Sequence, residues 1–450
     1  MSSLSTHKSS ANENFVCACK EWMRSACERE PFYKQYEKQR YCVLHFPGKE
    51  KSTAFNEAFN RKREIKDFNF RGVWFPDELS FKNFRFEEKA DFSSATFYEY
   101  VDFGDAIFEK EAKFLSSIFM VGASFASVKF KAWADFRYCG FGDRADFLHA
   151  TFSERANFNG VIFYGQADYG SATFNSEVNF SGTIFSKQTF FGTATFEDYV
   201  RFSSKDDLGF AGSEHKQMFG ETSSLDFQFI RTEKPDRISF HTLILRPHWF
   251  VNVDTRNFDF TNVEWRGSLN QEIENLKINE VSPPHRLLAI ACRQLAVNAE
   301  ENHRYEEASK FRYWSMDAQR RERWRGFTLW RLSWWYWAAS GYGERVLRAF
   351  LVLLGAWFIF ALLYMQVGFA RWEPKLTNEN DVAMAKHDEI GSPLSPLSRS
   401  LAYSASVMTL QKPEPRPATI AAQTLFIIET ILGPLQAALL ALAIRRKFMR

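Results

Sequence analysis

Phenylalanine recurs through the first half of the chain with a period that few folds can accommodate. The chain has 48 Phe among its 450 residues. One series of rings recurs every eleven residues from Phe70 to Phe202, with Tyr169 as its one substitution, and a second runs from Phe75 to Phe196. Together the two series place rings at alternating spacings of five and six residues. A unit this short has no room for a helix–turn–helix repeat, and it fits a short extended edge followed by a corner, wound into a solenoid.

A small residue accompanies the rings at a fixed distance. Two residues before most rings stands a small or β-branched residue, with a polar residue often between them; examples are Ala90, Ala95, Val101, Ala106, Ala112 and Ala123. If both point inward, the small residue leaves room for stacked rings, and each buried Phe contributes roughly 2–3 kcal/mol. Four sides of about 5.5 residues would close a coil of about 22 residues. The pattern therefore predicts a solenoid with a phenylalanine core.

The repeat resembles a known family. The segments ADFSSATF, ADFRYCGF, ADFLHATF and ANFNGVIF look like those of pentapeptide-repeat proteins, over about residues 68–265. The resemblance implies a right-handed quadrilateral β-helix, and we place this domain at 68–267. After Phe202 the pattern loosens, and FDFTNVEW (Phe258–Trp265) is interpreted as the last coil.

The charge of the repeat region bears on its partners. Some pentapeptide-repeat proteins are acidic mimics of duplex DNA. Residues 61–212 contain 22 acidic and 18 basic residues, a mild and mixed balance. We therefore expect a sensor or scaffold with a protein partner on the β-helix, and not a partner of nucleic-acid enzymes. Net charge over the whole chain is +3, which does not predict nucleic-acid binding either.

Two apolar runs predict membrane spans in a C-terminal domain, 346–450. Ala349–Phe369 is 21 residues without a charge, and Ile420–Ile444 has one charge, Glu429. About 20 residues cross a hydrocarbon core of about 30 Å at a rise of 1.5 Å each. Basic residues precede the first run and follow the second, so we expect a two-pass protein with both termini cytoplasmic and residues 370–419 outside.

The segment before the first span, 268–345, is predicted to be a helical connector. Pro284–Arg321 has helical apolar spacing with a break near His303, which indicates two antiparallel helices. Beyond it, arginines alternate with tryptophans. This composition next to a span favours an interfacial helix that contacts membrane lipid through Trp330, Trp334, Trp335 and Trp337. Nucleic-acid binding is the less favoured interpretation.

The order of segments in the C-terminal domain resembles a second family. Between the spans lies Leu397–Leu410, which is too short to cross and is interpreted as a re-entrant helix. This layout, with ERVLRAF before the first span and IIETILGPLQAALLALAIRRKF in the second, resembles pentapeptide-repeat proteins that carry a two-transmembrane, potassium-channel-like pore domain. The resemblance implies a homo-oligomer, a tetramer with cytoplasmic solenoids.

The filter of a potassium channel is missing from this sequence. A filter needs a Thr-x-Gly-Tyr-Gly run, whose carbonyls coordinate the ion. After Thr409 the chain reads LQKPEPRP (Leu410–Pro417), with three prolines and no glycine. Two alternatives remain: a non-selective, channel-like protein, or a membrane-tethered interaction module without transport. In the first, Thr409, Glu429, Gly433 and Pro434 are pore or gating residues. In the second, Glu429 pairs with a neighbouring helix and the kink at Gly433-Pro434 is static.

The N-terminal segment, 1–67, contains a candidate metal site. Cys17, Cys19, Cys27, Cys42 and His45 follow the pattern C-x-C-x7-C-x14-C-x2-H. Thiolates and imidazole are zinc ligands, and we choose Cys19, Cys27, Cys42 and His45, with Cys17 as the substitute. Similar Cys/His heads precede the repeats in related proteins, where YCVLHFPGKEK (Tyr41–Lys51) is the matching part. Free thiols that cap the first coil are the alternative.

No catalytic constellation emerges from the sequence. It has no glycine-rich phosphate loop between a strand and a helix, and no Ser/His/Asp set stands out from chance. We therefore do not expect an enzyme.

Overall fold

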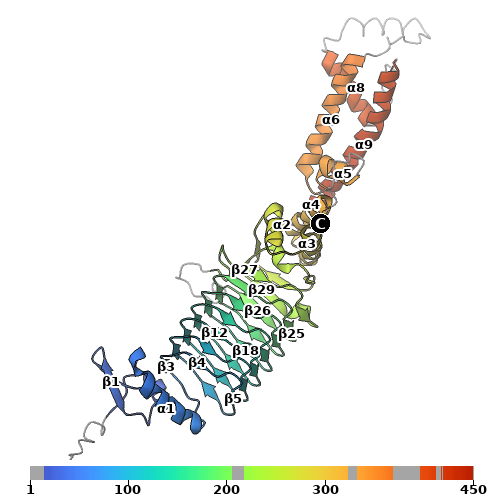
Figure 1. Ribbon diagram of the computed structural model, residues 1–450. Coiled ribbons are helices and arrows are strands. Elements are labelled where there is room, and N and C mark those ends of the chain that lie inside the picture. Colours follow the sequence, from blue (N-terminus) through green and yellow to red (C-terminus); the bar gives the residue numbers. More distant parts are fainter. Residues whose placement is uncertain are drawn as a thin grey trace, which may run out of the picture. The chain divides into compact units, whose positions relative to one another are not determined.

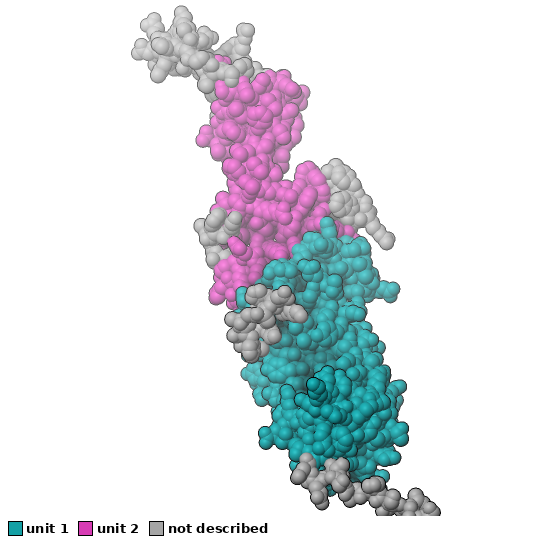
Figure 2. Space-filling view, turned by 90° about the vertical axis from the view of Figure 1, so that its left-hand side faces the viewer, with its two compact units in different colours: residues 1–298 teal, residues 299–450 magenta. Residues whose placement is uncertain are grey.

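The eleven-residue rhythm folds into a four-sided parallel β-solenoid (Figure 1). The computed structural model describes residues 15–204, 217–322, 332–367, 396–411, 417 and 419–448. The chain divides into two compact units, 1–298 and 299–450, coloured teal and magenta in Figure 2. The solenoid and the Cys/His segment belong to the first unit, and the two long apolar helices belong to the second.

Each side of the coil is one parallel sheet, numbered here in chain order. Sheet I contains β3 (Trp74–Phe75), β7 (Thr96–Phe97), β11 (Ile118–Phe119), β15 (Gly140–Phe141), β19 (Ile162–Phe163) and β23 (Ile184–Phe185). Sheet II contains β4 (Leu79–Ser80), β8 (Val101–Asp102), β12 (Ala123–Ser124), β16 (Ala145–Asp146), β20 (Ala167–Asp168), β24 (Gln188–Phe190) and β27 (Ser224–Asp226). Sheet III contains β5 (Arg85–Phe86), β9 (Ile107–Phe108), β13 (Lys129–Phe130), β17 (Thr151–Phe152), β21 (Thr173–Phe174), β25 (Thr195–Phe196) and β28 (Arg231–Thr232). Sheet IV contains β6 (Ala90–Asp91), β10 (Ala112–Lys113), β14 (Ala134–Asp135), β18 (Ala156–Asn157), β22 (Val178–Asn179), β26 (Val200–Ser203), β29 (Ile238–His241) and β31 (Asp259–Thr261). A separate pair joins β30 (Ile244–Leu245) to β32 (Glu264–Trp265).

The register of the sheets gives the length of a coil. Ala90 pairs with Ala112 and Ala112 pairs with Ala134, so one coil is 112 − 90 = 22 residues. The eleven-residue period is therefore half a coil, and opposite sides of the solenoid repeat the same pattern. The tallest sheet contains eight strands. The predicted β-solenoid and its 22-residue coil are confirmed.

Stacked aromatic rings fill the interior. Phe92 and Phe114 stack with centroids 5.1 Å apart, and Phe86 and Phe108 stack at 4.4 Å. Neighbouring columns meet edge to face, as between Phe92 and Phe103 at 5.7 Å. Both geometries are the preferred ones for aromatic pairs. Ala90 and its equivalents are also fully buried, so the small residues face the interior between the columns, as expected.

Every second corner of the coil uses a left-handed residue. These residues recur at intervals of eleven, at Asn83, Ser94, Asp105, Ser116, Ser127, Tyr138, His149, Gly160, Ser171, Gly182 and Thr193. At one of them the Phe92 carbonyl accepts a hydrogen bond from Ala95 N at 2.9 Å, and Asp91 Oδ1 accepts one from Ser93 N at 3.0 Å. The polar residue between the small residue and the ring thus supports the turn that follows it.

The solenoid continues past the point where its sequence pattern loosens. Val200 pairs with Ile238 across 238 − 200 = 38 residues, and Phe202 stacks on Phe240 at 4.9 Å. Phe185 stacks on Phe219 at 5.5 Å. The chain therefore makes one more complete coil after Phe202, before it reaches the segment that the sequence pattern predicts to be the last coil. An insertion that includes 205–216, which lie outside the described residues, hides this coil in the sequence.

The N-terminal segment covers the first coil. It contains η1 (Glu21–Ala26), the hairpin β1 (Phe32–Tyr36) and β2 (Gln39–Cys42), η2 (Lys49–Lys51) and α1 (Ser52–Glu64). From α1, Phe59 packs 5.5 Å from Phe70, and Phe55 packs 5.5 Å from Phe75. The helix thus shields the first rings from water.

Short helices lie between the last strands of the solenoid, and longer helices follow its last coil. In the first unit, η4 (Pro235–Arg237) and η5 (Pro247–Phe250) lie between the last strands, and α2 (Leu269–Ile278) begins at Ser268 with a capping box. The next helix, α3 (Pro284–Glu301), is tied to the solenoid by Asn298 Nδ2, which donates to the carbonyls of Thr255, Arg256 and Phe258. The boundary between the compact units falls within α3, inside the predicted connector 268–345.

Within its described residues, the second unit consists of helices joined by turns. It contains α4 (Tyr305–Glu322), α5 (Leu332–Ser340), α6 (Val346–Val367), α8 (Pro396–Met408) and α9 (Ile420–Phe448). The predicted break between two helices near His303 is observed, since α3 ends at Glu301 and His303 has a φ of +59°.

Candidate functional sites

Four side chains with metal-binding atoms converge in the N-terminal segment. Cys17, Cys27, Cys42 and His45 are buried, and their ligand atoms all lie within 4.8 Å of one another. Cys17 Sγ is 3.7 Å from Cys42 Sγ, and His45 Nδ1 is 3.8 Å from Cys17 Sγ and 3.2 Å from Cys42 Sγ. A tetrahedral zinc with Zn–S bonds of about 2.3 Å holds its sulfurs about 3.8 Å apart. Both the donor types and their spacing fit such an ion.

The orientation of His45 also fits a metal ligand. Its Nε2 lies 2.9 Å from the carbonyl of Arg71, a group that can only accept a hydrogen bond. Nε2 therefore carries a proton whether or not the ring is charged, and Nδ1 faces the thiols, where a bound metal would take the place of its proton. Ligating histidines commonly donate their second ring nitrogen to a carbonyl in this way.

The structure separates the roles of the two cysteines in the C-x-C pair. Cys17, which the sequence hypothesis kept as the substitute, belongs to the four-residue cluster, and the favoured Cys19 does not. Cys19 is nevertheless close, with its Sγ 3.9 Å from Cys27 Sγ. Cys42 N donates to Cys17 Sγ at 3.5 Å, which directs the Cys17 sulfur toward the end of β2. Five donors thus surround a site that needs four.

The thiols of the cluster differ in their pKa, since hydrogen bonds with Cys17, Cys19 and Cys42 raise the pKa of Cys27. Hydrogen bonds with Cys19, Cys27 and Cys42 lower the pKa of Cys17. Burial lowers the pKa of His45, but its hydrogen bonds with the thiols outweigh burial and raise that pKa to about 12. Burial lowers the pKa of Lys51 to about 7. The Lys51 ammonium donates to the carbonyls of Val43 and Leu44 at 2.8 and 2.9 Å, beside the cluster.

The second candidate site is the bundle formed by α6, α8 and α9. Val346–Val367 and Ile420–Arg446 are long and apolar enough to cross a membrane, and only 17% of each apolar window is buried. Large apolar side chains on both helices are therefore exposed, including Leu347, Leu351, Ile359, Ile427, Ile431 and Leu435. A helix of a soluble core would bury these side chains.

Short polar links join the three helices on the inside of the bundle. Glu429 of α9 is fully buried, and Ser404 of α8 donates to its Oε1. The ring of Tyr364 on α6 lies 4.9 Å from that of Tyr403 on α8. Trp357 Nε1 donates to the Leu401 carbonyl at 3.0 Å. The short helix α8 is thus bonded to both long helices.

The remaining pore or gating candidates lie at the far end of α8 and within α9. Thr409 is exposed just after α8, and its hydroxyl donates back to the Ala405 carbonyl at 2.9 Å. Gly433 packs so closely that a Cβ placed there would lie 2.8 Å from Met408 Cγ. Pro434 lies within α9, which remains helical through both residues. The close packing against Met408 is enough to explain why residue 433 is a glycine.

The predicted interfacial tryptophans are only partly described. Trp330 lies outside the described residues, and Trp334, Trp335 and Trp337 belong to α5. Trp335 is 53% exposed, whereas the Trp337 ring stacks against Arg320 and Arg348. Trp335 and Trp337 therefore differ in their surroundings, although both belong to one short helix.

Gln436 is a polar contact that the sequence reasoning missed. Its Nε2 donates to the carbonyls of Ala339 and Ala349, at 2.9 and 2.8 Å, and so joins α9 to the end of α5 and the start of α6. The signal was available, because Gln436 is a polar residue within an apolar span, where amide side chains hydrogen-bond to neighbouring helices.

Comparison with known proteins supports the repeat. A family profile described as "Pentapeptide repeats (9 copies)" matches residues 70–118. No curated protein and no solved structure matches the chain. The match lies within the solenoid, where β3 to β11 form, so the chain carries pentapeptide repeats in a parallel β-solenoid followed by helices, two of them long and apolar.

Proposed function

We propose that the chain is a channel-like membrane protein in which α6 and α9 cross the bilayer and α8 enters it without crossing. The observation that carries this proposal is the arrangement of apolar and polar side chains in the bundle. Apolar side chains of α6 and α9 are exposed on the outside, whereas Glu429, Ser404 and Gln436 are buried inside. This is the distribution that a bilayer favours, since charged and polar groups are costly in lipid.

The position of α8 supports the channel-like part of the proposal. Its 13 residues are too few to cross a membrane, and it packs against both α6 and α9. A short helix held between two spans is the arrangement of a re-entrant pore helix. Copies of the chain, four by resemblance, would then surround a central axis.

Potassium selectivity is not part of the proposal. The segment after α8, Leu410–Pro417, has no glycine to form a filter, and Lys412 and Arg416 would repel cations. We therefore propose a pore that does not select potassium. The solenoid would act on the cytoplasmic side as a sensor or a scaffold for a protein partner.

The Cys/His cluster would give the N-terminal segment a structural zinc. Cys17, Cys27, Cys42 and His45 supply three thiolates and one imidazole, and a site closed by four protein ligands leaves no position for substrate. The ion would join Cys17 and Cys27 to the end of β2, and its role would be folding and not catalysis.

A membrane-tethered interaction module without transport is the second candidate. The close contact between Gly433 and Met408 favours it, because a hinge at Gly433 would have to break that packing. In this function the bundle only anchors the solenoid, and Glu429 is a structural partner of Ser404.

Reconstitution separates the two functions. The full chain, purified in detergent, is incorporated into liposomes, its subunit number is measured by native mass spectrometry, and ion flux is measured in the same preparation. A channel predicts a tetramer and flux of both sodium and potassium, which the Glu429→Ala variant should alter and the Glu322→Ala variant on α4 should not. A monomer without flux would contradict the channel and support the tether.

A further inference from the structure

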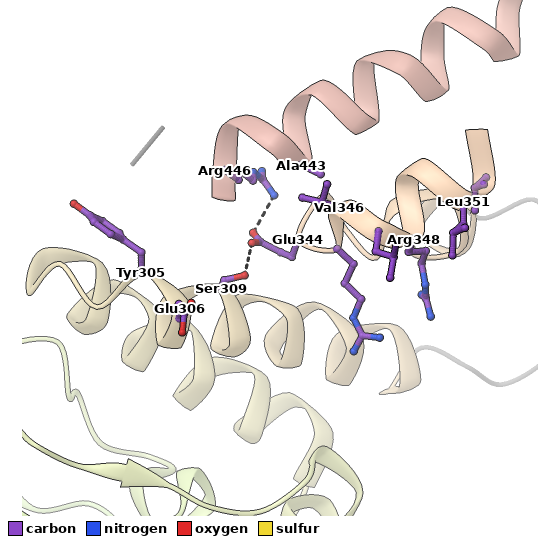
Figure 3. Close-up of a pocket in the computed structure, with 12 residues that line it drawn as sticks. Tyr305, Glu306, Ser309, Glu344, Val346, Arg348, Leu351, Ala443 and Arg446 are labelled. Carbon is purple, nitrogen blue, oxygen red and sulfur yellow. Dashed lines mark hydrogen bonds and ion pairs between the residues drawn. The ribbon is translucent and has the colours of Figure 1, made fainter. Parts of the chain in front are cut away.

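A pocket of about 920 Å³ lies where the chain enters α6, beside the end of α9 and the start of α4 (Figure 3). All of its lining residues belong to the second unit. The pocket is lined both by arginines and by aliphatic side chains. This combination is needed neither to fold the solenoid nor to form the buried polar contacts of the bundle.

One acidic residue of the pocket lining, Glu344, is already neutralised by an ion pair. Arg446 of α9 donates to Glu344 Oε1 at 3.1 Å, and Ser309 of α4 donates to Glu344 Oε2 at 2.7 Å, as the dashed lines in Figure 3 show. The Glu344 side chain is only 5% exposed. The remaining charged lining residues are Arg345, Arg348 and the exposed Glu306, which leaves the pocket with one net positive charge.

Aromatic rings hold both of these arginines. The Arg345 guanidinium lies 4.3 Å from the Tyr313 ring centroid, and that of Arg348 lies 4.9 Å from the Trp337 ring centroid. Arg348 also donates to the Trp337 carbonyl at 3.2 Å. A guanidinium has five N–H donors in its plane, so stacking on its face and one carbonyl bond leave donors for an anion. Two arginines held in this way suit the oxygens of a phosphate.

The aliphatic lining runs onto the outer face of α6. Leu347, Leu351 and Val352 line the pocket and are 70%, 56% and 37% exposed. A small soluble anion gains nothing from these side chains. A phospholipid would place its phosphate at the arginines and an acyl chain along the leucines.

We propose that this pocket binds an anionic phospholipid. The proposal rests on the proposed function to the extent that the exposed face of α6 must meet lipid. The bound lipid would fill the space between the start of α6, the end of α9 and α4, three segments that Glu344 already joins.

The test compares lipids in detergent, where membrane insertion has no influence on the result. The thermal unfolding of the purified full chain is followed with added dioctanoyl phosphatidylglycerol, dioctanoyl phosphatidylcholine or glycerol 3-phosphate. Only phosphatidylglycerol should raise the unfolding temperature. The double variant Arg345→Gln/Arg348→Gln should weaken its apparent affinity by about 25-fold, since each basic residue near an anionic lipid contributes about 5-fold.

The control is Arg445→Gln, which removes one positive charge from the last turns of α9, at a residue that does not line the pocket. It should bind phosphatidylglycerol like the parent chain. Equal stabilisation by the two lipids would overturn the proposal even if the double variant fails to fold. An equal effect of glycerol 3-phosphate would replace it with a soluble phosphate ligand. Extraction of the chain from membranes by alkaline carbonate would instead refute the membrane function, whatever the lipid test shows.

Discussion

Tyr169 is the one residue of its ring series that carries a polar atom into the solenoid core. Its ring stacks 4.8 Å from Phe147 and 4.9 Å from Phe191, as a Phe would. Its hydroxyl is buried and has no hydrogen-bond partner among the described residues. An unsatisfied buried hydroxyl costs about 1–3 kcal/mol.

Tyr169→Phe should therefore stabilise the solenoid. We expect a gain of about 1 kcal/mol, because the substitution removes the unpaired hydroxyl and keeps the stacked ring. Thermal or urea unfolding of the full chain measures the change. Tyr164→Phe is the control, since Tyr164 is 57% exposed and should give no gain. A loss of stability in Tyr169→Phe would show that the hydroxyl has a partner.

Asp226 predicts a dependence of stability on pH. Burial raises its pKa above the usual value, and the charge of Asp168 adds to this. The folded state then binds more protons than the unfolded state at pH values just above about 3.9, so this carboxyl makes stability fall as pH rises through its raised pKa.

Asp226→Asn should remove that fall. Asp226 Oδ1 accepts a hydrogen bond from Gln228 N at 3.0 Å, and Asn157 and Asn179 make the equivalent bond in other coils. We expect the variant to be more stable than the parent chain at pH 7 and equal to it below pH of about 3. Unfolding measured across this range checks the prediction, with the exposed Asp236→Asn as control. A gain that persists at low pH would assign the effect to something other than charge.

At the scale of elements, the eleven-residue period predicted the solenoid well, and the Cys/His pattern predicted the metal site only in part. A repeat of eleven fixes the strand spacing and the inward face wherever it is unbroken. The 38-residue interval from Val200 to Ile238 was not predicted, because an insertion shifts the ring positions by an amount that no local pattern reveals. In the C-x-C pair, one residue separates the two thiols, and only the direction of the chain beside β2 decides which of them joins Cys42.

This choice can be tested by metal content. Cys17→Ser and Cys27→Ser should each reduce zinc from about one ion per chain to near zero, whereas Cys19→Ser should retain it. The measurement is elemental analysis of the purified chain, with circular dichroism as a check on folding. If Cys19→Ser loses the metal and Cys17→Ser keeps it, the choice made from sequence was the correct one.

At the scale of the whole molecule, sequence reasoning gave four segments and the structure gives two compact units. The predicted connector, 268–345, is not one body, because α2 and most of α3 belong to the first unit and α4 and α5 to the second. Periodicity finds helices, but it does not show which core each helix packs against. The contacts of Asn298 with the last coil, for example, have no signature in the sequence.

The proposed topology makes a prediction about accessibility. In sealed cells, a membrane-impermeant maleimide should label a cysteine introduced in the 370–395 segment, and should not label one introduced at Ser2. The six native cysteines are all buried, so labelling should report on the introduced ones. Labelling in detergent provides the positive control. Labelling at Ser2 in sealed cells, without labelling in the 370–395 segment, would reverse the proposed orientation.

The equivalence of opposite sides has a consequence for how this solenoid can change in evolution. Sheets II and IV carry one pattern and sheets I and III the other, because half a coil is eleven residues. Loss of 22 residues would shorten the stack by one layer and leave everything downstream in the same angular phase. Loss of eleven residues would also keep every ring stacked on a ring of the neighbouring coil. The chain would then exit the solenoid from the opposite side of the coil. Gene duplications and deletions can thus tune length and phase separately, without passing through an unfolded intermediate.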